Sequence, residues 1–321
     1  MTDKAVLTIA CGKQLYLDLA AALARSFRVW HADSDLALHI ATDAVRRFPD
    51  DVRDAPGVRF IDITEHDFGT GFENKLHIDE FLPARRTLFV DVDCLLTGSL
   101  NPVFDGFEGR SVSVVGGEKS EGEWFGDLEA RCRRFGVSSV PVFVGATYYI
   151  ENDETAQRVF AKAREIKHQY DEAGFVRLRG LPNEEPLISV GMALNDQTPV
   201  PDDGTIKADA MHFEEEMRVN VLEGTSYFRG TSDQVTAWGV TEARPTIAHF
   251  NNSYAEKMPY IREQKKLDSI YGSGRSPWWA SVHAGVTRSL PFWTTEYTKE
   301  VLRPVYRAFF GTREIQNERV E

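Results

Sequence analysis

The chain has 321 residues, of which 42% are hydrophobic and 27% are charged, a composition typical of a folded globular protein. Its formal net charge of −12 argues against a protein that binds phosphate backbones through basic patches, so no nucleic-acid partner is expected. The three cysteines, Cys11, Cys94 and Cys132, form no C-x-x-C pair, which favours a reducing, cytoplasmic compartment over a zinc site or a disulfide framework.

The N-terminal half predicts an α/β sheet. Residues 5–10 are a short apolar run that predicts a strand ending in a tight turn at Gly12; the run is too short for a secretory signal. Apolar residues recur at helical spacing over 15–27, and residues 36–42 and 58–63 predict two further strands. This order favours a mainly parallel, doubly wound sheet flanked by helices.

Residues 72–82 predict a helix that leads into the strand 87–96, TLFVDVDCLL, which carries two carboxylates. Asp91 and Asp93 are two residues apart, so in an extended chain they point to the same side. Two like charges so close require a cation, and oxygen ligands favour Mg²⁺ or Mn²⁺ with substrate phosphates completing the shell. The crevice beyond the carboxyl ends of the strands is also where open α/β sheets bind ligands.

Later elements continue the alternation. Residues 140–150 predict a strand interrupted by Gly145, where a bulge or a close approach to the backbone is expected. Further strands are predicted at 111–115 and 244–250, helices at 123–135, 152–169 and 187–194, and an irregular acidic segment at 195–233. From residue 254 onwards two helices are predicted. No stretch approaches the ~20 apolar residues of a membrane span. The simplest division is a domain over 1–258 and a C-terminal helical extension over 259–321.

Taken together, these motifs resemble the retaining glycosyltransferases of family 8, the glycogenin and lipopolysaccharide galactosyltransferase type, which have the nucleotide-sugar-binding GT-A fold. The resemblance covers residues 5 to 258, and its best match is LFVDVDCLLTGSLNPVF. The other matching positions are Tyr16, Asp43, Lys75, Gly145, the loop Asn183-Glu184-Glu185-Pro186, and His249. Two departures are Val144, where the family commonly has Asn, and the absence of its His-x-x-Gly-x-x-Lys-Pro-Trp pattern after His249.

The resemblance implies a metal-dependent transferase that moves a hexose from a nucleoside-diphosphate sugar, expected to be a UDP-sugar, to a glycan or other hydroxyl acceptor, with retention. It implies that Asp91, Asp93 and His249 coordinate Mn²⁺ or Mg²⁺ on the donor diphosphate. Glu184 and Glu185 are the candidate catalytic residues; Glu185 is favoured because a residue before proline is held extended. The expected donor contacts are Ala10, Cys11, Gly12, Tyr16, Asp43, Lys75, Val92 and Gly145.

Simpler roles stay open for these residues. His249 can be a strand-end histidine bonded to backbone, Lys75 a solvated helix residue, and the two glutamates exposed loop acids. A haloacid-dehalogenase-type phosphatase also uses Asp-x-Asp after a strand, but Leu95 stands where that class has threonine, and the motif comes late in the chain. A non-catalytic nucleotide-sugar-binding module is the third alternative. The sequence leaves the sugar, the acceptor and a homo-oligomer open.

Overall fold

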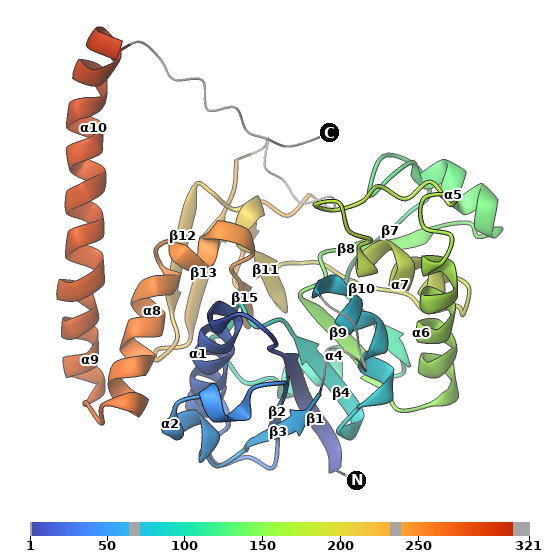
Figure 1. The fold of residues 1–321 in the computed structure, drawn as a ribbon, viewed down its shortest axis with the longest axis horizontal. Coiled ribbons are helices and arrows are strands. Elements are labelled where there is room, and N and C mark those ends of the chain that lie inside the picture. The colour runs from blue at the N-terminus through green and yellow to red at the C-terminus, as the bar shows by residue number, and fades with distance from the viewer. Residues whose placement is uncertain (1, 64–70, 232–238, 311–321) are drawn as a thin grey trace. The chain divides into compact units, whose positions relative to one another are not determined.

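The computed structural model describes residues 2–63, 71–231 and 239–310. At its centre is a six-stranded sheet in the order β3-β2-β1-β4-β9-β6 (Figure 1). Its strands are β1 (Thr2–Ile9), β2 (Leu38–Thr42), β3 (Val58–Asp62), β4 (Ala84–Val90), β6 (Val112–Ser113) and β9 (Thr147–Glu151). The first four are mutually parallel, and β9 runs antiparallel to both β4 and β6. The predicted mixed, mainly parallel sheet flanked by helices is therefore confirmed.

The helices α6 and α7 pack against the sheet through one apolar core (Figure 1). Phe89 and Tyr148 of the sheet meet Phe160 and Leu187 of these helices in that core. The helices of the first 260 residues are α1 (Gln14–His31), α2 (Asp50–Arg53), α4 (Asn101–Gly106), α5 (Leu128–Phe135), α6 (Glu154–Lys167) and α7 (Glu184–Ala193). Short 3₁₀ segments are η1 (Val45–Arg47), η2 (Gly71–Glu80), η3 (Ala210–His212) and η5 (Asn252–Glu256). The helix predicted over 72–82 is thus a 3₁₀ segment.

The described residues also form three smaller sheets. One contains β11 (Lys207–Asp209), β15 (Ile247–His249) and β5 (Cys94–Leu96); β11 is parallel to β15, and β15 is antiparallel to β5. A second contains β10 (Val200–Pro201), β7 (Val115–Lys119) and β8 (Val140–Phe143), and a third contains β12 (Glu216–Asn220), β13 (Thr225–Arg229) and β14 (Glu242–Ala243). The segment 195–233, expected to be irregular, holds four of these strands. They are two to five residues long, too short for a visible period of two.

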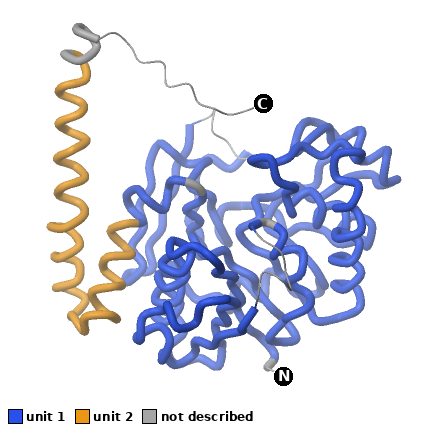
Figure 2. Tube along the Cα trace, viewed as in Figure 1, with its two compact units in different colours: residues 1–260 blue, residues 261–321 orange. Residues whose placement is uncertain are grey.

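Contacts divide the chain into two compact units, residues 1–260 and 261–321 (Figure 2). The domain boundary placed after residue 258 stays a prediction. The C-terminal region contains α8 (Tyr260–Leu267), η6 (Asp268–Gly272), α9 (Pro277–Ala284), η7 (Gly285–Ser289) and α10 (Leu290–Phe310). Within the second unit, Trp278 and Trp293 are exposed. Across the described residues, every helix is too short or too polar to span a bilayer.

Candidate functional site

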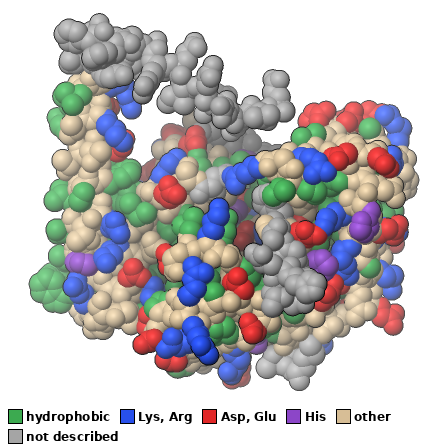
Figure 3. Space-filling model, viewed as in Figure 1, with side chains coloured by type: hydrophobic (Ala, Val, Ile, Leu, Met, Phe, Trp, Pro, Cys, Tyr) green, Lys and Arg blue, Asp and Glu red, His purple; other side chains and the backbone are tan. Residues whose placement is uncertain are grey.

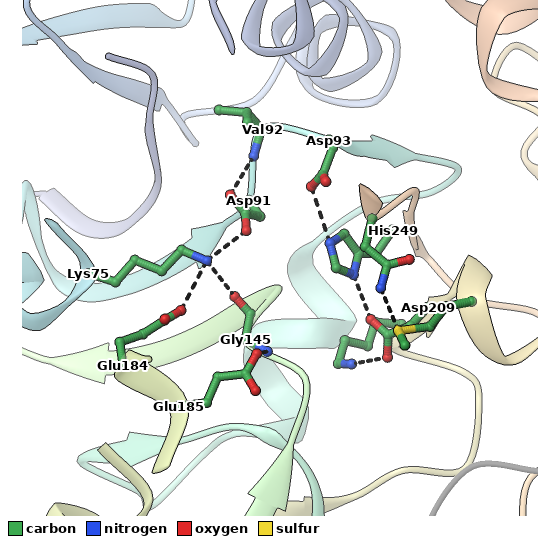
Figure 4. Close-up of polar contacts among 12 residues, drawn as sticks. Lys75, Asp91, Val92, Asp93, Gly145, Glu184, Glu185, Asp209 and His249 are labelled. Atoms are coloured by element: carbon green, nitrogen blue, oxygen red, sulfur yellow. Dashed lines mark hydrogen bonds and ion pairs between the residues drawn. The ribbon is translucent and has the colours of Figure 1, made fainter. Parts of the chain in front are cut away.

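The two carboxylates of the Asp-x-Asp motif leave the sheet at the end of β4. The extended strand expected over 87–96 is interrupted, because Val92 and Asp93 form a turn between β4 and β5. Asp91 and Asp93 therefore do not share one side of an extended chain; they face different partners (Figure 4). Asp91 accepts a hydrogen bond from the backbone N–H of Val92 at 3.0 Å, which fixes the turn.

Lys75 supplies a positive charge to the first carboxylate. Its Nζ lies 2.7 Å from Asp91 Oδ2 and 3.3 Å from Glu184 Oε1, and it donates to the carbonyl oxygen of Gly145 at 3.0 Å (Figure 4). Burial alone would lower the pKa of Lys75, but the charges of Asp91 and Glu184 outweigh burial and raise this pKa. Lys75 is therefore a charged residue of the site, and the interpretation of it as a solvated lysine is wrong.

Glu184 and Glu185 lie in the first turn of α7, where Asn183 caps the helix by accepting from the N–H of Glu185 at 3.2 Å. The extended backbone expected before Pro186 is not found, because proline is compatible with the first turn of a helix. Glu184 is 2% exposed and Glu185 is partly buried, so neither is an exposed loop acid. The Oε2 atom of Glu184 is buried without a hydrogen-bond partner.

Gly145 lets these two glutamates approach the backbone closely. Its N–H donates to Glu185 Oε1 at 2.7 Å. A Cβ added at Gly145 would lie 2.9 Å from Glu185 Oε1 and 3.0 Å from Glu184 Oε1, inside ordinary contact distance. Burial, followed by the charge of Glu184, raises the pKa of Glu185 to about 8. Burial also raises the pKa of Glu184, against the charge of Lys75, so at neutral pH the pair of glutamates holds a proton beside the Lys75–Asp91 ion pair.

The second carboxylate faces His249 at the end of β15. His249 Nε2 lies 3.2 Å from Asp93 Oδ1, while His249 Nδ1 donates to Asp209 Oδ1 at 2.6 Å (Figure 4). Asp93 Oδ1 is buried and has no partner in hydrogen-bond geometry. Two of the three predicted metal ligands, Asp93 and His249, therefore lie side by side, and His249 bonds to a side chain instead of backbone.

The residues present here fit a divalent cation. Potential donor atoms of Asp93, Cys94 and His249 lie within 4.8 Å of one another, the only such group among the described residues; Asp91 is outside it. A carboxylate oxygen lacking a hydrogen-bond partner beside an imidazole nitrogen is a donor set that Mn²⁺ accepts. Burial raises the pKa of the Cys94 thiol well above its ordinary value, so Cys94 stays a neutral thiol.

Most of the remaining predicted contacts gather at the ends of β1, which neighbours β4 in the sheet, and of β2, which lies on the other side of β1. The N–H of Gly12 lies 3.3 Å from both carboxylate oxygens of Asp43. Arg47 donates to the carbonyl oxygen of Gly12 at 3.0 Å and so holds the same loop. Tyr16, in the first turn of α1, is 42% exposed. Ala10 and Cys11 lie in the loop after β1, whereas Val92 lies in the turn after β4.

Comparisons with known proteins give fold matches only. Neither a protein-family model nor a curated protein sequence matches the chain. Among solved structures, the galactosyltransferase LgtC in complex with donor and acceptor sugar analogs matches 84% of this chain and 95% of its own, with 13% identity and a TM-score of 0.52. An active-site mutant of LgtC gives 14% identity, 86% and 99% coverage, and a TM-score of 0.54. The bifunctional glycosyltransferase WbbM has 10% sequence identity to this chain and a TM-score of 0.50; the match covers 88% of this chain and 51% of WbbM.

The chain has the GT-A glycosyltransferase fold. Three residues beside the site, Arg47, Lys207 and Asp209, were not predicted from the sequence. Lys207 and Asp209 carried a usable signal: opposite charges two residues apart within the otherwise apolar run 206–210 point to the same side of a strand. Arg47 carried none, because its contact with Gly12 depends on how the strands β1 and β2 lie side by side.

Proposed function

We propose that this protein is a metal-dependent glycosyltransferase that moves a hexose from a nucleoside-diphosphate sugar, with UDP as the expected nucleotide, to a glycan or other hydroxyl acceptor with retention. The observation that carries the proposal is the buried Asp93 Oδ1 at the end of β4, which lies 3.2 Å from His249 Nε2 but forms no hydrogen bond. That position, in a GT-A fold, is the crevice where ligands of open α/β sheets bind.

Asp93 and His249 would hold Mn²⁺ or Mg²⁺, with Asp91 as the third ligand that the family resemblance implies. The metal, when bound, supplies Lewis-acid stabilisation of the charge on the departing diphosphate. In the structure Asp91 pairs with Lys75. We propose that Lys75 also contacts the donor phosphates when the donor is bound. The loop containing Gly12, together with Asp43 and Tyr16, would receive the nucleoside.

Glu184 and Glu185 are proposed to face the transferred sugar and the acceptor. The unpartnered Oε2 of Glu184 can accept a hydrogen bond from a sugar hydroxyl, and the charge of Glu184 can stabilise an oxocarbenium-like centre. Glu185, protonated at neutral pH, can donate a hydrogen bond to a sugar oxygen. A cytoplasmic location is part of the proposal because the three cysteines are all free. The phosphatase alternative gains no support from the fold.

The proposal is tested by calorimetric titration of UDP and GDP with and without Mn²⁺, together with turnover of the corresponding sugar donors. We expect one diphosphate to bind only with metal. Asp93→Ala should weaken this binding by more than about 100-fold, because losing a metal ligand costs more than losing a residue that only hydrogen-bonds to a ligand. The matched control is Asp105→Ala, which removes an exposed carboxylate paired with Lys4. Absence of binding by any nucleoside diphosphate would refute the proposal, and binding without turnover would favour the non-catalytic module.

A further inference from the structure

Beside the Asp93–His249 pair lies a buried ion pair that the proposed reaction has not used. Lys207 Nζ is 2.5 Å from Asp209 Oδ2, and the two side chains are 1% and 4% exposed. Lysine and aspartate are almost never fully buried unless they are paired. The other oxygen of Asp209 accepts from His249 Nδ1 at 2.6 Å. The contacts therefore run in a line from Lys207 through Asp209 and His249 to Asp93.

The sheet β11-β15-β5 fixes this line through backbone pairing. Asp209 on β11 is the register partner of His249 on β15, and His249 is the register partner of Cys94 on β5. Cys94 directly follows Asp93, and the N–H of Phe250 donates to the carbonyl oxygen of Asp93 at 3.0 Å. Three segments far apart in the sequence thus meet at one row of the sheet, and the ring of His249 lies between two carboxylates.

Stability alone does not account for the Lys207–Asp209 pair. A buried ion pair loses hydration that its attraction barely repays, and well-packed apolar residues of similar volume are often equally or more stabilising. The pair instead places a carboxylate 2.6 Å from His249 Nδ1, where it accepts the proton of that nitrogen and leaves Nε2 facing Asp93. A histidine that donates from Nδ1 to a carboxylate keeps its Nε2 lone pair for a metal, and the same bond fixes the ring orientation.

We infer that Asp209, held in place by Lys207, is a positioning residue that orients His249 so that its Nε2 faces the cation beside Asp93. The inference rests on the proposed function. Asp209 itself touches neither metal nor substrate; it acts through the imidazole. Its loss should therefore weaken metal binding by about 10- to 100-fold, the range seen when outer-shell partners of ligating histidines are removed.

The decisive variant is Lys207→Met combined with Asp209→Leu, which removes both charges and every acceptor for His249 Nδ1. We expect this variant to fold, because apolar side chains replace the ion pair, and to bind UDP in the presence of Mn²⁺ about 10- to 100-fold more weakly. The matched control is Arg25→Met with Asp51→Leu. It removes another pair, 2.8 Å apart and 7% and 15% exposed, that joins α1 to α2. Its affinity should equal that of the wild type.

A second readout follows His249 directly. In the Mg²⁺–UDP complex of the wild type, NMR should detect a protected His249 Nδ1–H, assigned by its absence in His249→Asn. The double variant should lose this resonance. If the double variant does not fold, Lys207→Met with Asp209→Ala, which removes the same charges and the same acceptor without adding volume at position 209, undergoes the same measurements. Wild-type affinity and an unchanged Nδ1–H signal in a folded Asp209 variant would overturn the positioning role alone. A wild type that binds no nucleoside diphosphate would overturn the proposed function.

Discussion

Glu185 is the residue whose charge state the structure makes sensitive to pH. Burial and the charge of Glu184 raise its pKa to about 8, whereas its Oε1 still accepts from the N–H of Gly145 at 2.7 Å. Between the unfolded pKa and about 8 the folded protein binds more protons than the unfolded chain. The free energy of unfolding that depends on Glu185 therefore falls as pH rises through this window.

Glu185→Gln should remove that pH dependence, because a glutamine oxygen accepts the same bond from Gly145 and never ionises. We expect the free energy of unfolding of the variant, minus that of the wild type, to increase by on the order of 3 kcal/mol between about pH 5 and about pH 9. Urea unfolding at several pH values measures the difference. Glu184→Gln serves as the companion variant, since loss of the neighbouring charge lowers the pKa of Glu185 and flattens the wild-type slope. A stability difference independent of pH would show that Glu185 is ionised throughout.

At the scale of elements, the turn between β8 and β9 couples the sheet to the start of α7. Gly145 is in that turn, and a Cβ there would meet the Tyr148 hydroxyl at 2.6 Å as well as both glutamate carboxylates. The two carboxylates are the ends of flexible side chains and can move, whereas the buried ring of Tyr148 is held by Phe89 and Phe143. The consequence of added volume is therefore displaced glutamates with little loss of fold.

Gly145→Ala should accordingly separate chemistry from donor binding. We expect turnover to fall by about 100-fold, the cost that a displacement of about 1 Å can carry, while Mn²⁺-dependent UDP affinity stays near that of the wild type. Steady-state kinetics and calorimetry on the same preparation measure the two quantities. Gly98→Ala is the control, because its Cβ would meet Thr246 at 3.5 Å, an ordinary contact. Equal turnover in the two variants would exclude Glu184 and Glu185 from the reaction.

The elements also explain which parts of the site could be predicted. The strand β4 and the carboxylates after it were visible because a long apolar run ends abruptly in charge. The turn at Val92 was not, because it depends on β5 leaving to pair with β15, more than 150 positions later in the sequence. The opposite charges of Lys207 and Asp209 were visible in the sequence, but their place in the site was not, because β11 is three residues long and meets His249 only through its register with β15.

For the molecule as a whole, the fold was predictable because strands and helices alternate with clear periods through the first 194 residues. The formal net charge was equally plain from composition. On the face drawn in Figure 3, acidic and basic side chains of the described residues are interspersed, and none gather into an extended basic surface. With a net charge of −12, the molecule's average field attracts a free divalent cation and repels a free diphosphate. This asymmetry is consistent with a donor that binds through its metal.

The affinity for Mn²⁺ at saturating UDP should therefore fall as NaCl rises from about 50 mM to about 500 mM, because salt shortens the range of the attraction. Uridine, which is neutral, should bind with an affinity independent of salt. A triple variant, Asp50→Asn with Asp54→Asn and Glu129→Gln, tests whether the salt dependence comes from the whole molecule or from the site. It neutralises three exposed acids that are remote in sequence from Asp93 and His249. If the field of the whole molecule matters, this variant should depend less on salt than the wild type. An unchanged dependence would assign the attraction to the carboxylates of the site, Asp93 first among them.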